Sequence, residues 1–128
     1  MSFASILQEI VDECGGGLAA ALMGADGIPI DQVEASGEVS DSLSDSLSDE
    51  VEVLGVEFGR ILDELRKAAD SVAGGALEEV SIRLANFWVL MRMVDEETYL
   101  VLVIGPDGNA GKARFLMRRQ LMALREEL

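Results

Sequence analysis

The strongest constraint in this sequence is a stripe of apolar residues that recurs every three or four positions over about eight helical turns. Its members are Leu43, Leu47, Val51, Leu54, Phe58, Ile61, Leu65, Ala68 and Val72. From Leu47 onward the steps alternate between four and three residues, which is the spacing of a heptad-like seam. The pattern predicts one long helix from about Asp45 to Ala73, ended by Gly74 and Gly75.

A second stripe of small and apolar residues lies beside the first, at Gly55, Gly59, Leu62, Ala69 and Ala73. One stripe can cover a sheet, while the stripe with the glycines would allow close approach of another helix from outside. We therefore expect this helix to contact a second copy of the chain. The alternative is that a single wrapped core buries both stripes.

The entry into the long helix is an acidic serine repeat with a period of four, which spans residues 39–50. Such a repeat is also typical of a low-complexity linker. Its Leu43 and Leu47 continue the apolar stripe, so we interpret it as the lead-in to the helix and the whole chain, residues 1–128, as one domain.

The segments before the long helix predict a helix and a β-hairpin. Ser2 to Cys14 has apolar residues at helical spacing, with Ser2 as a cap, and three glycines follow. Leu18 to Met23 and Ile28 to Val33 read as two strands joined by an Asp-Gly turn. Pro29 cannot donate a ladder hydrogen bond, so it belongs at a sheet edge or at the start of a strand.

After the long helix the period changes to two, which predicts three more strands. They lie around Val80 to Leu84, Phe87 to Val94 and Thr98 to Ile104, and a final helix from about Ala110 to Glu126 follows a Gly-Pro-Asp-Gly breaker. The order is α-β-β-α-β-β-β-α. The expected fold class is therefore α+β, with a five-stranded antiparallel sheet in a sandwich with helices.

Charge and composition exclude several classes of protein. The net charge is −14, and residues 1–59 hold thirteen acidic residues and no basic ones. This argues against nucleic acid and anionic membranes as partners. The chain has no histidine and one cysteine, and no apolar run reaches the roughly 18 residues of a membrane span. With no signal segment at its start, we expect a cytoplasmic protein without metal or cofactor.

Two groups of residues could form a binding site, and each also has a purely structural interpretation. Gly105 to Lys112 lies where a phosphate-binding loop would be, but the glycine spacing is wrong and Ala113 replaces the hydroxyl residue that would hold magnesium. A simple strand-to-helix turn is the preferred reading. Arg114, Arg118 and Arg119 could bind an acidic partner surface, or they could be a solvated face that balances the acidic body.

The order of elements and several local motifs resemble the roadblock/dynein-light-chain family. The motifs are Ala25-Asp26-Gly27-Ile28-Pro29-Ile30 in the first hairpin, Ser81 to Leu84 and Tyr99 to Ile104 in the last strands, and Gly111-Lys112-Ala113-Arg114 at the closing helix. The last motif is similar to the bacterial branch, which includes regulators of Ras-like GTPases in gliding motility. The resemblance implies a roadblock/longin-like sandwich that forms a homodimer through paired central helices and a sheet continued across both subunits.

The sequence therefore predicts a homodimeric regulator or scaffold that binds a small Ras-like GTPase and modulates its nucleotide cycle, without being an enzyme itself. A structural adaptor of a motor or signalling complex, with no effect on GTP turnover, is the alternative. The expected homodimer contacts are Leu54, Gly55, Phe58, Gly59, Ile61, Leu62, Leu65, Val80 and Ile82. Arg114, Arg118 and Arg119 are the expected partner-binding residues.

Overall fold

The computed structural model describes residues 2–35 and 41–128, and it leaves the side chains of residues 41–50 and of residue 52 outside the description. The predicted order of elements is confirmed, except that two helices close the chain instead of one. The elements are α1 (Phe3–Glu13), β1 (Gly17–Gly24), β2 (Pro29–Glu34), α2 (Asp41–Ser71), β3 (Glu79–Arg83), β4 (Trp88–Met93), β5 (Thr98–Ile104), α3 (Ala110–Arg119) and α4 (Leu121–Glu127).

The five strands form one antiparallel sheet in the order β2-β1-β5-β4-β3. The hairpin between β1 and β2 turns at Gly27, whose φ of +86° suits glycine, and the Asp26 carboxylate accepts a hydrogen bond from the backbone N–H of Ile28 at 3.0 Å. Pro29 begins the edge strand β2, as predicted. The other edge is β3, the strand that follows the long helix.

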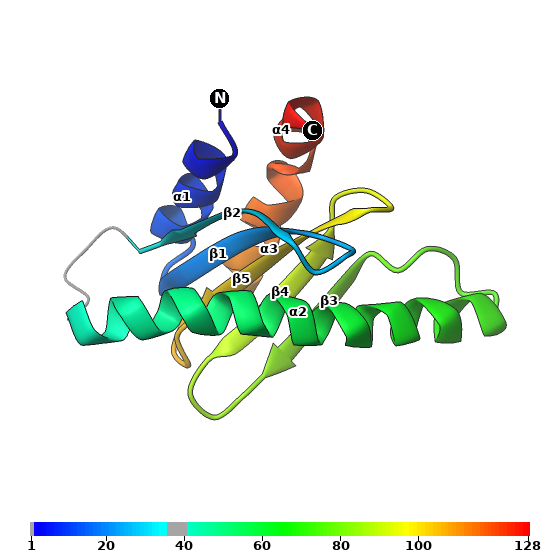
Figure 1. Ribbon diagram of the computed structural model, residues 1–128, viewed down its shortest axis with the longest axis horizontal. Coiled ribbons are helices and arrows are strands. Elements are labelled where there is room, and N and C mark those ends of the chain that lie inside the picture. The colour runs from blue at the N-terminus through cyan, green and yellow to red at the C-terminus, as the bar shows by residue number, and fades with distance from the viewer. Residues whose placement is uncertain (1, 36–40) are drawn as a thin grey trace.

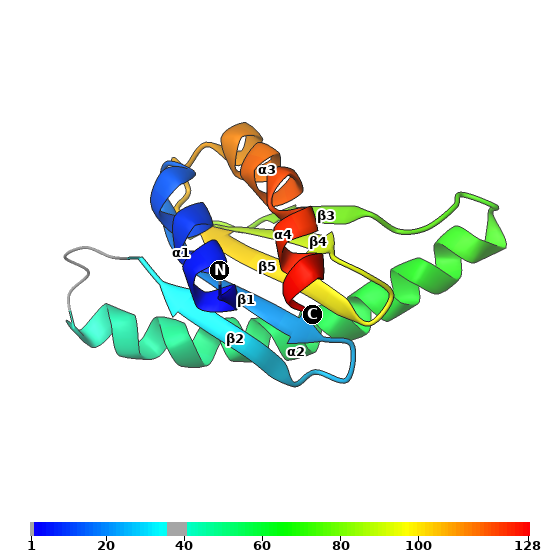
Figure 2. The ribbon, with the colours of Figure 1, turned by 90° about the horizontal axis from the view of Figure 1, so that it is seen from above.

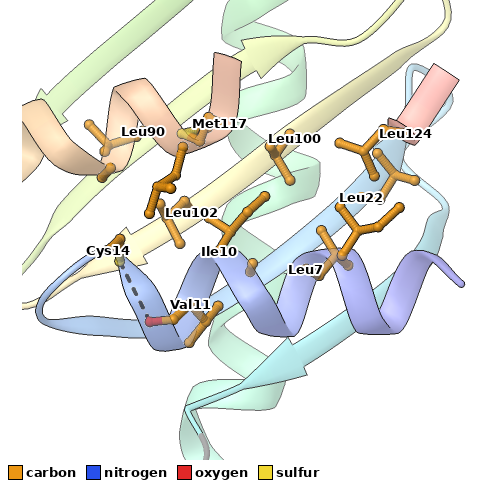
Figure 3. Packing of buried hydrophobic residues seen from close by; sticks show 14 of the residues in the cluster. Leu7, Ile10, Val11, Cys14, Leu22, Leu90, Leu100, Leu102, Met117 and Leu124 are labelled. Atoms are coloured by element: carbon orange, nitrogen blue, oxygen red, sulfur yellow. Dashed lines mark hydrogen bonds between the residues drawn. The ribbon is translucent and has the colours of Figure 1, made fainter. Parts of the chain in front are cut away.

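One face of the sheet is covered by α1, α3 and α4, and together they enclose a core of large aliphatic side chains (Figure 3). The Ser2 hydroxyl caps α1 by accepting a hydrogen bond from the backbone N–H of Ser5, as expected for a serine before a helix. Fully buried members of this core include Ile10, Leu22, Leu100, Leu102 and Leu124. We call this side of the sheet the closed face.

The opposite face is covered by α2 alone, which crosses in front of the sheet in Figure 1 and extends beyond it on the right. Figure 2 shows α2 on the far side of the sheet from α1 and α4. The backbone of α2 approaches β1 and β2 most closely. The strands β4 and β3 on this side therefore have less helix above them, and we call this side the open face.

The ends of the long helix differ from the prediction. It begins at Asp41 instead of Asp45, so the serine repeat from that residue on is helical, while residues 39 and 40 of the repeat lie outside the described residues. Acidic residues in the first turns of a helix interact favourably with its dipole, which fits the early start. It ends at Ser71, because Ala73 has a φ of +53° and the Gly74 N–H closes the end on the Ala69 carbonyl at 2.9 Å.

The last helix is interrupted at Gln120, which ends α3 and precedes α4, with a φ of −88° and a ψ of −1°. The single helix predicted from Ala110 to Glu126 is therefore wrong in this detail. Leu121 and Leu124 beyond the bend are both buried against the closed face, so the bend lets the chain keep its apolar side on the sheet.

Candidate interaction surface

The glycine stripe of α2 faces the chain's own sheet, so the expectation that it points outward is wrong. A Cβ atom placed on Gly55 would lie 2.8 Å from Met23 Cε, and one placed on Gly59 would collide with the Tyr99 hydroxyl. The Tyr99 hydroxyl also donates a hydrogen bond to the Gly55 carbonyl. The glycines bring α2 close to β1 and β5 within one chain, and Leu62, only 4% exposed, lies on the same side of the helix.

The apolar residues beside this stripe are only partly covered by the described residues of the chain. Ile61 is 45% exposed and Leu65 is 38% exposed, while Leu54 and Phe58 are half-buried. On the opposite flank, Val56 lies beside Gly27 in the hairpin between β1 and β2. Leu54, Phe58, Ile61 and Leu65 therefore look away from β2, toward the strands β4 and β3, and we call these four residues the open flank.

The edge strand β3 extends the same apolar surface. Val80 and Ile82 pair with Met91 and Val89 of β4, and all four side chains belong to the apolar cluster on the open face. Val80 and Ile82 are only half-buried. The open flank and β3 thus place six of the nine expected homodimer contacts on one partly exposed surface, beside a strand whose outer edge pairs with no strand of the described chain.

Each face of the sheet holds one buried weak acid. Burial raises the pKa of the Tyr99 phenol above its ordinary value of 10.0, and the nearby Asp26 and Asp63 carboxylates add to that rise. Burial also raises the pKa of the Cys14 thiol on the closed face, above 9.0. The Cys14 thiol points at the Val11 carbonyl in the last turn of α1 (Figure 3), so it is a packing residue there.

The three predicted partner-binding arginines are in different situations. Arg114 donates to the Ser81 hydroxyl from Nε at 3.2 Å and from a terminal nitrogen at 2.9 Å, which ties α3 to the edge strand. Arg119 lies 3.5 Å from the Glu13 carboxylate of α1. Arg118 makes no hydrogen bond or ion pair with any residue that the structure describes. All three are exposed, and whether they bind a partner stays a prediction.

Two exposed apolar residues lie next to these arginines, and neither is among the binding residues expected from the sequence. Phe115 is 58% exposed and Met122 is 71% exposed. Both stand outside the apolar stripe of α3 and α4, which faces the sheet with Ala113, Leu116 and Leu124. Their exposure could have been predicted from the sequence, because both residues lie outside the main apolar stripe of an amphipathic helix.

The loop from Gly105 to Lys112 is a strand-to-helix turn that caps α3, which agrees with the preferred interpretation of the sequence. The Asn109 side chain accepts from the Lys112 N–H at 3.0 Å, and the Gly105 N–H donates to the Gly16 carbonyl at 2.8 Å. The N–H groups of Gly108 and Asn109 also have backbone acceptors, so these four donors of the loop are not free to bind a phosphate.

A groove of about 620 Å³ lies between the end of β4, the start of α4 and the segment that leads into β3. It is lined by three arginines and four acidic residues, and each arginine has a partner. Arg92 pairs with Glu79 at 3.0 Å, and Arg66 and Arg125 donate to backbone carbonyls of the hairpin between β4 and β5. The groove has one more acidic than basic residue in its lining and does not resemble an anion site.

In the described part of the chain, no three histidine, cysteine or acidic side chains gather closely enough to hold a metal ion. Among the helices that the structure describes, none has the length and apolar character of a membrane span. The partly uncovered apolar surface of α2 and β3 is therefore the main candidate for function.

Several solved structures share the fold of this chain. A roadblock/LC7 domain from Streptomyces avermitilis superposes with a TM-score of 0.80 at 14% identity, over 98% of this chain and 97% of that one. The gliding protein MglB from Thermus thermophilus superposes with a TM-score of 0.77 at 17% identity, over 96% of this chain and 85% of that one. The sandwich described above is thus the roadblock fold.

A further solved structure is similar to this chain in sequence as well as in fold. MglC from Myxococcus xanthus is 33% identical to this chain, and the match covers 100% of both chains with a TM-score of 0.69. No family model and no curated protein sequence matches the chain. On the match to MglC, together with the roadblock fold of the other neighbours, this chain belongs to the roadblock family, in the group that includes gliding-motility proteins.

Proposed function

We propose that this chain is a non-catalytic cytoplasmic docking domain that forms a homodimer through its open face, binds a small Ras-like GTPase and modulates its nucleotide cycle. The single observation that carries the proposal is the apolar open flank of α2 beside the unpaired edge of β3. An apolar surface of this kind on one side of a small domain is typical of an interaction site.

A second copy of the chain fits the open face for two reasons. The edge of β3 offers backbone donors and acceptors that a second β3 can pair with, and the open flank offers side chains that the same copy can bury. The name of one solved relative, MglB with a tetrameric arrangement, shows that self-association occurs among proteins of this fold.

The GTPase is proposed from the family and not from a contact in the structure. The gliding-motility relatives MglC and MglB supply the biological setting, and the family resemblance supplies the kind of partner. The acidic surface of the chain, with a net charge of −14, would steer it toward a basic surface on that partner.

The dimer is tested by replacing Ile61 with glutamate and measuring the mass by light scattering. A buried carboxylate at the contact should lower the mass to that of a single chain, 13.7 kDa. Val53, which is 61% exposed outside the open flank of α2, provides the matched control, and Val53→Glu should keep the mass of the dimer. An unchanged mass in Ile61→Glu would place the contact elsewhere.

GTP turnover tests the regulator itself. The purified chain is mixed with a Ras-like GTPase from the same genome, and both complex formation and the rate of phosphate release are measured. A complex with a changed rate supports the proposal. A complex with an unchanged rate favours the structural adaptor, and the absence of both with every such GTPase would refute the partner class.

A further inference from the structure

The outer side of α3 and α4 carries an apolar pair that the rest of the chain leaves uncovered. Phe115 is 58% exposed and Met122 is 71% exposed, so most of each side chain is in water. Phe115 lies opposite the buried side of α3, and Met122 lies in the first turn of α4, just past Gln120. A partner that covers this pair would gain the free energy of removing apolar surface from water.

Positive charge surrounds this pair. Half of the ten basic residues of the chain fall within residues 110–128, in a molecule whose net charge is −14. Arg119 lies over the Phe115 ring, 5.6 Å from its centroid, and Arg118 makes no hydrogen bond or ion pair with any described residue. Lys112, one turn before Phe115, is exposed. We call Lys112, Phe115, Arg118, Arg119 and Met122 the α3 patch.

The borders of the α3 patch are fixed by contacts within the chain. Arg114 is held by the Ser81 hydroxyl of β3 on one side, and the Glu9 and Glu13 carboxylates of α1 lie 4.0 Å and 3.5 Å from Arg119 on the other. Arg119 is thus pre-positioned beside the Phe115 ring, which lowers the entropy cost of using it in an interface. Arg118 keeps its full capacity for a carboxylate.

We propose that the α3 patch binds an acidic amphipathic segment of a partner protein. An apolar side chain of that segment covers Phe115 and Met122, and one of its carboxylates pairs with Arg118, whose planar guanidinium group suits bidentate contact with a carboxylate. A lipid surface is the less favoured occupant, since an extended anionic membrane would also face the acidic body of the chain, whereas a short segment faces only the patch.

This surface is independent of the open face. The α3 patch lies on the side of the sheet that α1, α3 and α4 cover, while the open flank belongs to α2 on the other side (Figures 1 and 2). A second copy on the open face and an acidic segment on the α3 patch can therefore be bound at the same time. The chain would then join two different partners.

The test uses a fluorescent acidic peptide with leucines on one helical face and glutamates beside them, titrated with the full chain and followed by fluorescence anisotropy. Saturable binding that weakens as salt is raised is expected. Arg118→Glu and Phe115→Ser should each weaken it by about tenfold, as for a central residue of a small interface. Amide chemical shifts should change along residues 112–122 and not along α2.

Controls with the same change in charge or polarity separate the patch from general effects. Lys67→Glu changes a side chain that is 73% exposed on α2, and Val53→Ser changes an exposed apolar residue there, so both should bind the peptide as the unchanged chain does. Equal weakening in controls and patch variants, shifts that map to α2, or no saturable binding would each overturn the proposal. So would binding to phosphatidylglycerol vesicles in place of the peptide.

Discussion

The two faces of the sheet are built from the same strands, but their covers differ. On the closed face three helices enclose large side chains such as Leu22, Leu102 and Leu124, which have no exposed surface. On the open face a single helix approaches closely at two glycines, and the residues beside them, such as Ile61 and Leu65, stay exposed.

The two faces therefore differ in how far the chain buries its own apolar residues. The closed face supplies the larger of the two buried cores, and the chain completes that core by itself. On the open face, α2 is packed closely on the sheet only along Gly55 and Gly59, and apolar side chains beside that line stay partly exposed. The following changes test this division, from the largest expected effect to the smallest.

The largest contrast is expected between truncations on the two faces. Leu102→Ala leaves a cavity in the closed core and should lower the free energy of unfolding by about 3 kcal/mol. Ile61→Ala removes an exposed side chain, so for the single chain the loss should stay below about 1 kcal/mol. Urea unfolding at low protein concentration measures both, and equal losses would contradict the division into two faces.

Gly59→Ala tests how closely α2 is seated. The added methyl group collides with the Tyr99 hydroxyl and disturbs its hydrogen bond to the Gly55 carbonyl, so a loss of about 2 kcal/mol is expected. Tyr99→Phe makes room, so the same substitution should cost less in that background. Gly55→Ala meets only the flexible end of Met23 and should cost less than Gly59→Ala. Strict additivity of Gly59→Ala and Tyr99→Phe would mean that they do not touch.

The buried acids predict a loss of stability at alkaline pH, with one contribution from each face. Because folding raises the pKa of both groups, the unfolded chain releases their protons first, and stability falls as pH rises above about 9 for Cys14 and about 10 for Tyr99. Cys14→Ala should remove the part of the stability loss that begins at the lower pH, and Tyr99→Phe should remove the part that begins at the higher pH. Urea midpoints measured from about pH 8 to about pH 11 report this. Parallel curves for all three proteins would rule out both contributions.

The smallest effect is expected at the end of α2, away from both faces. Ala73 holds a φ of +53°, which glycine adopts without a clash, so Ala73→Gly should raise the free energy of unfolding by about 0.5 kcal/mol. Ala68→Gly, within the helix, is the matched control and should lower it by up to about 1 kcal/mol. Thermal melting of the two variants should therefore shift in opposite directions.

The sequence predicted the elements well, because their signals are local. Alternation along Val80 to Leu84, the Asp-Gly turn before Pro29 and the heptad-like stripe each need only a few neighbouring residues. The direction of the two stripes of α2 could not be predicted in this way. It depends on Met23 and Tyr99, which come from distant parts of the chain and leave room for a helix only at a glycine.

Only some of the residues expected at the interaction surface are exposed, again because the direction of the stripes depends on distant residues. Ile61, Leu65, Val80 and Ile82 are partly exposed together, whereas Gly55, Gly59 and Leu62 are used inside the chain. A glycine allows close packing both against a partner and against the chain's own sheet. The sequence pattern is the same in the two cases, so it does not tell them apart. Whether the first group forms a homodimer contact stays a prediction.

The length of α2 has a consequence for the dynamics of the chain. Its 31 residues extend over about 46 Å, whereas five strands span about 19 Å across the sheet. From Lys67 to Ala76 nearly every side chain is exposed, and in Figure 1 this end projects past the strands. Amide hydrogens in these last turns should exchange with solvent far faster than those near Gly59, so a molecule that binds there would reveal itself by slowing exchange in that segment alone.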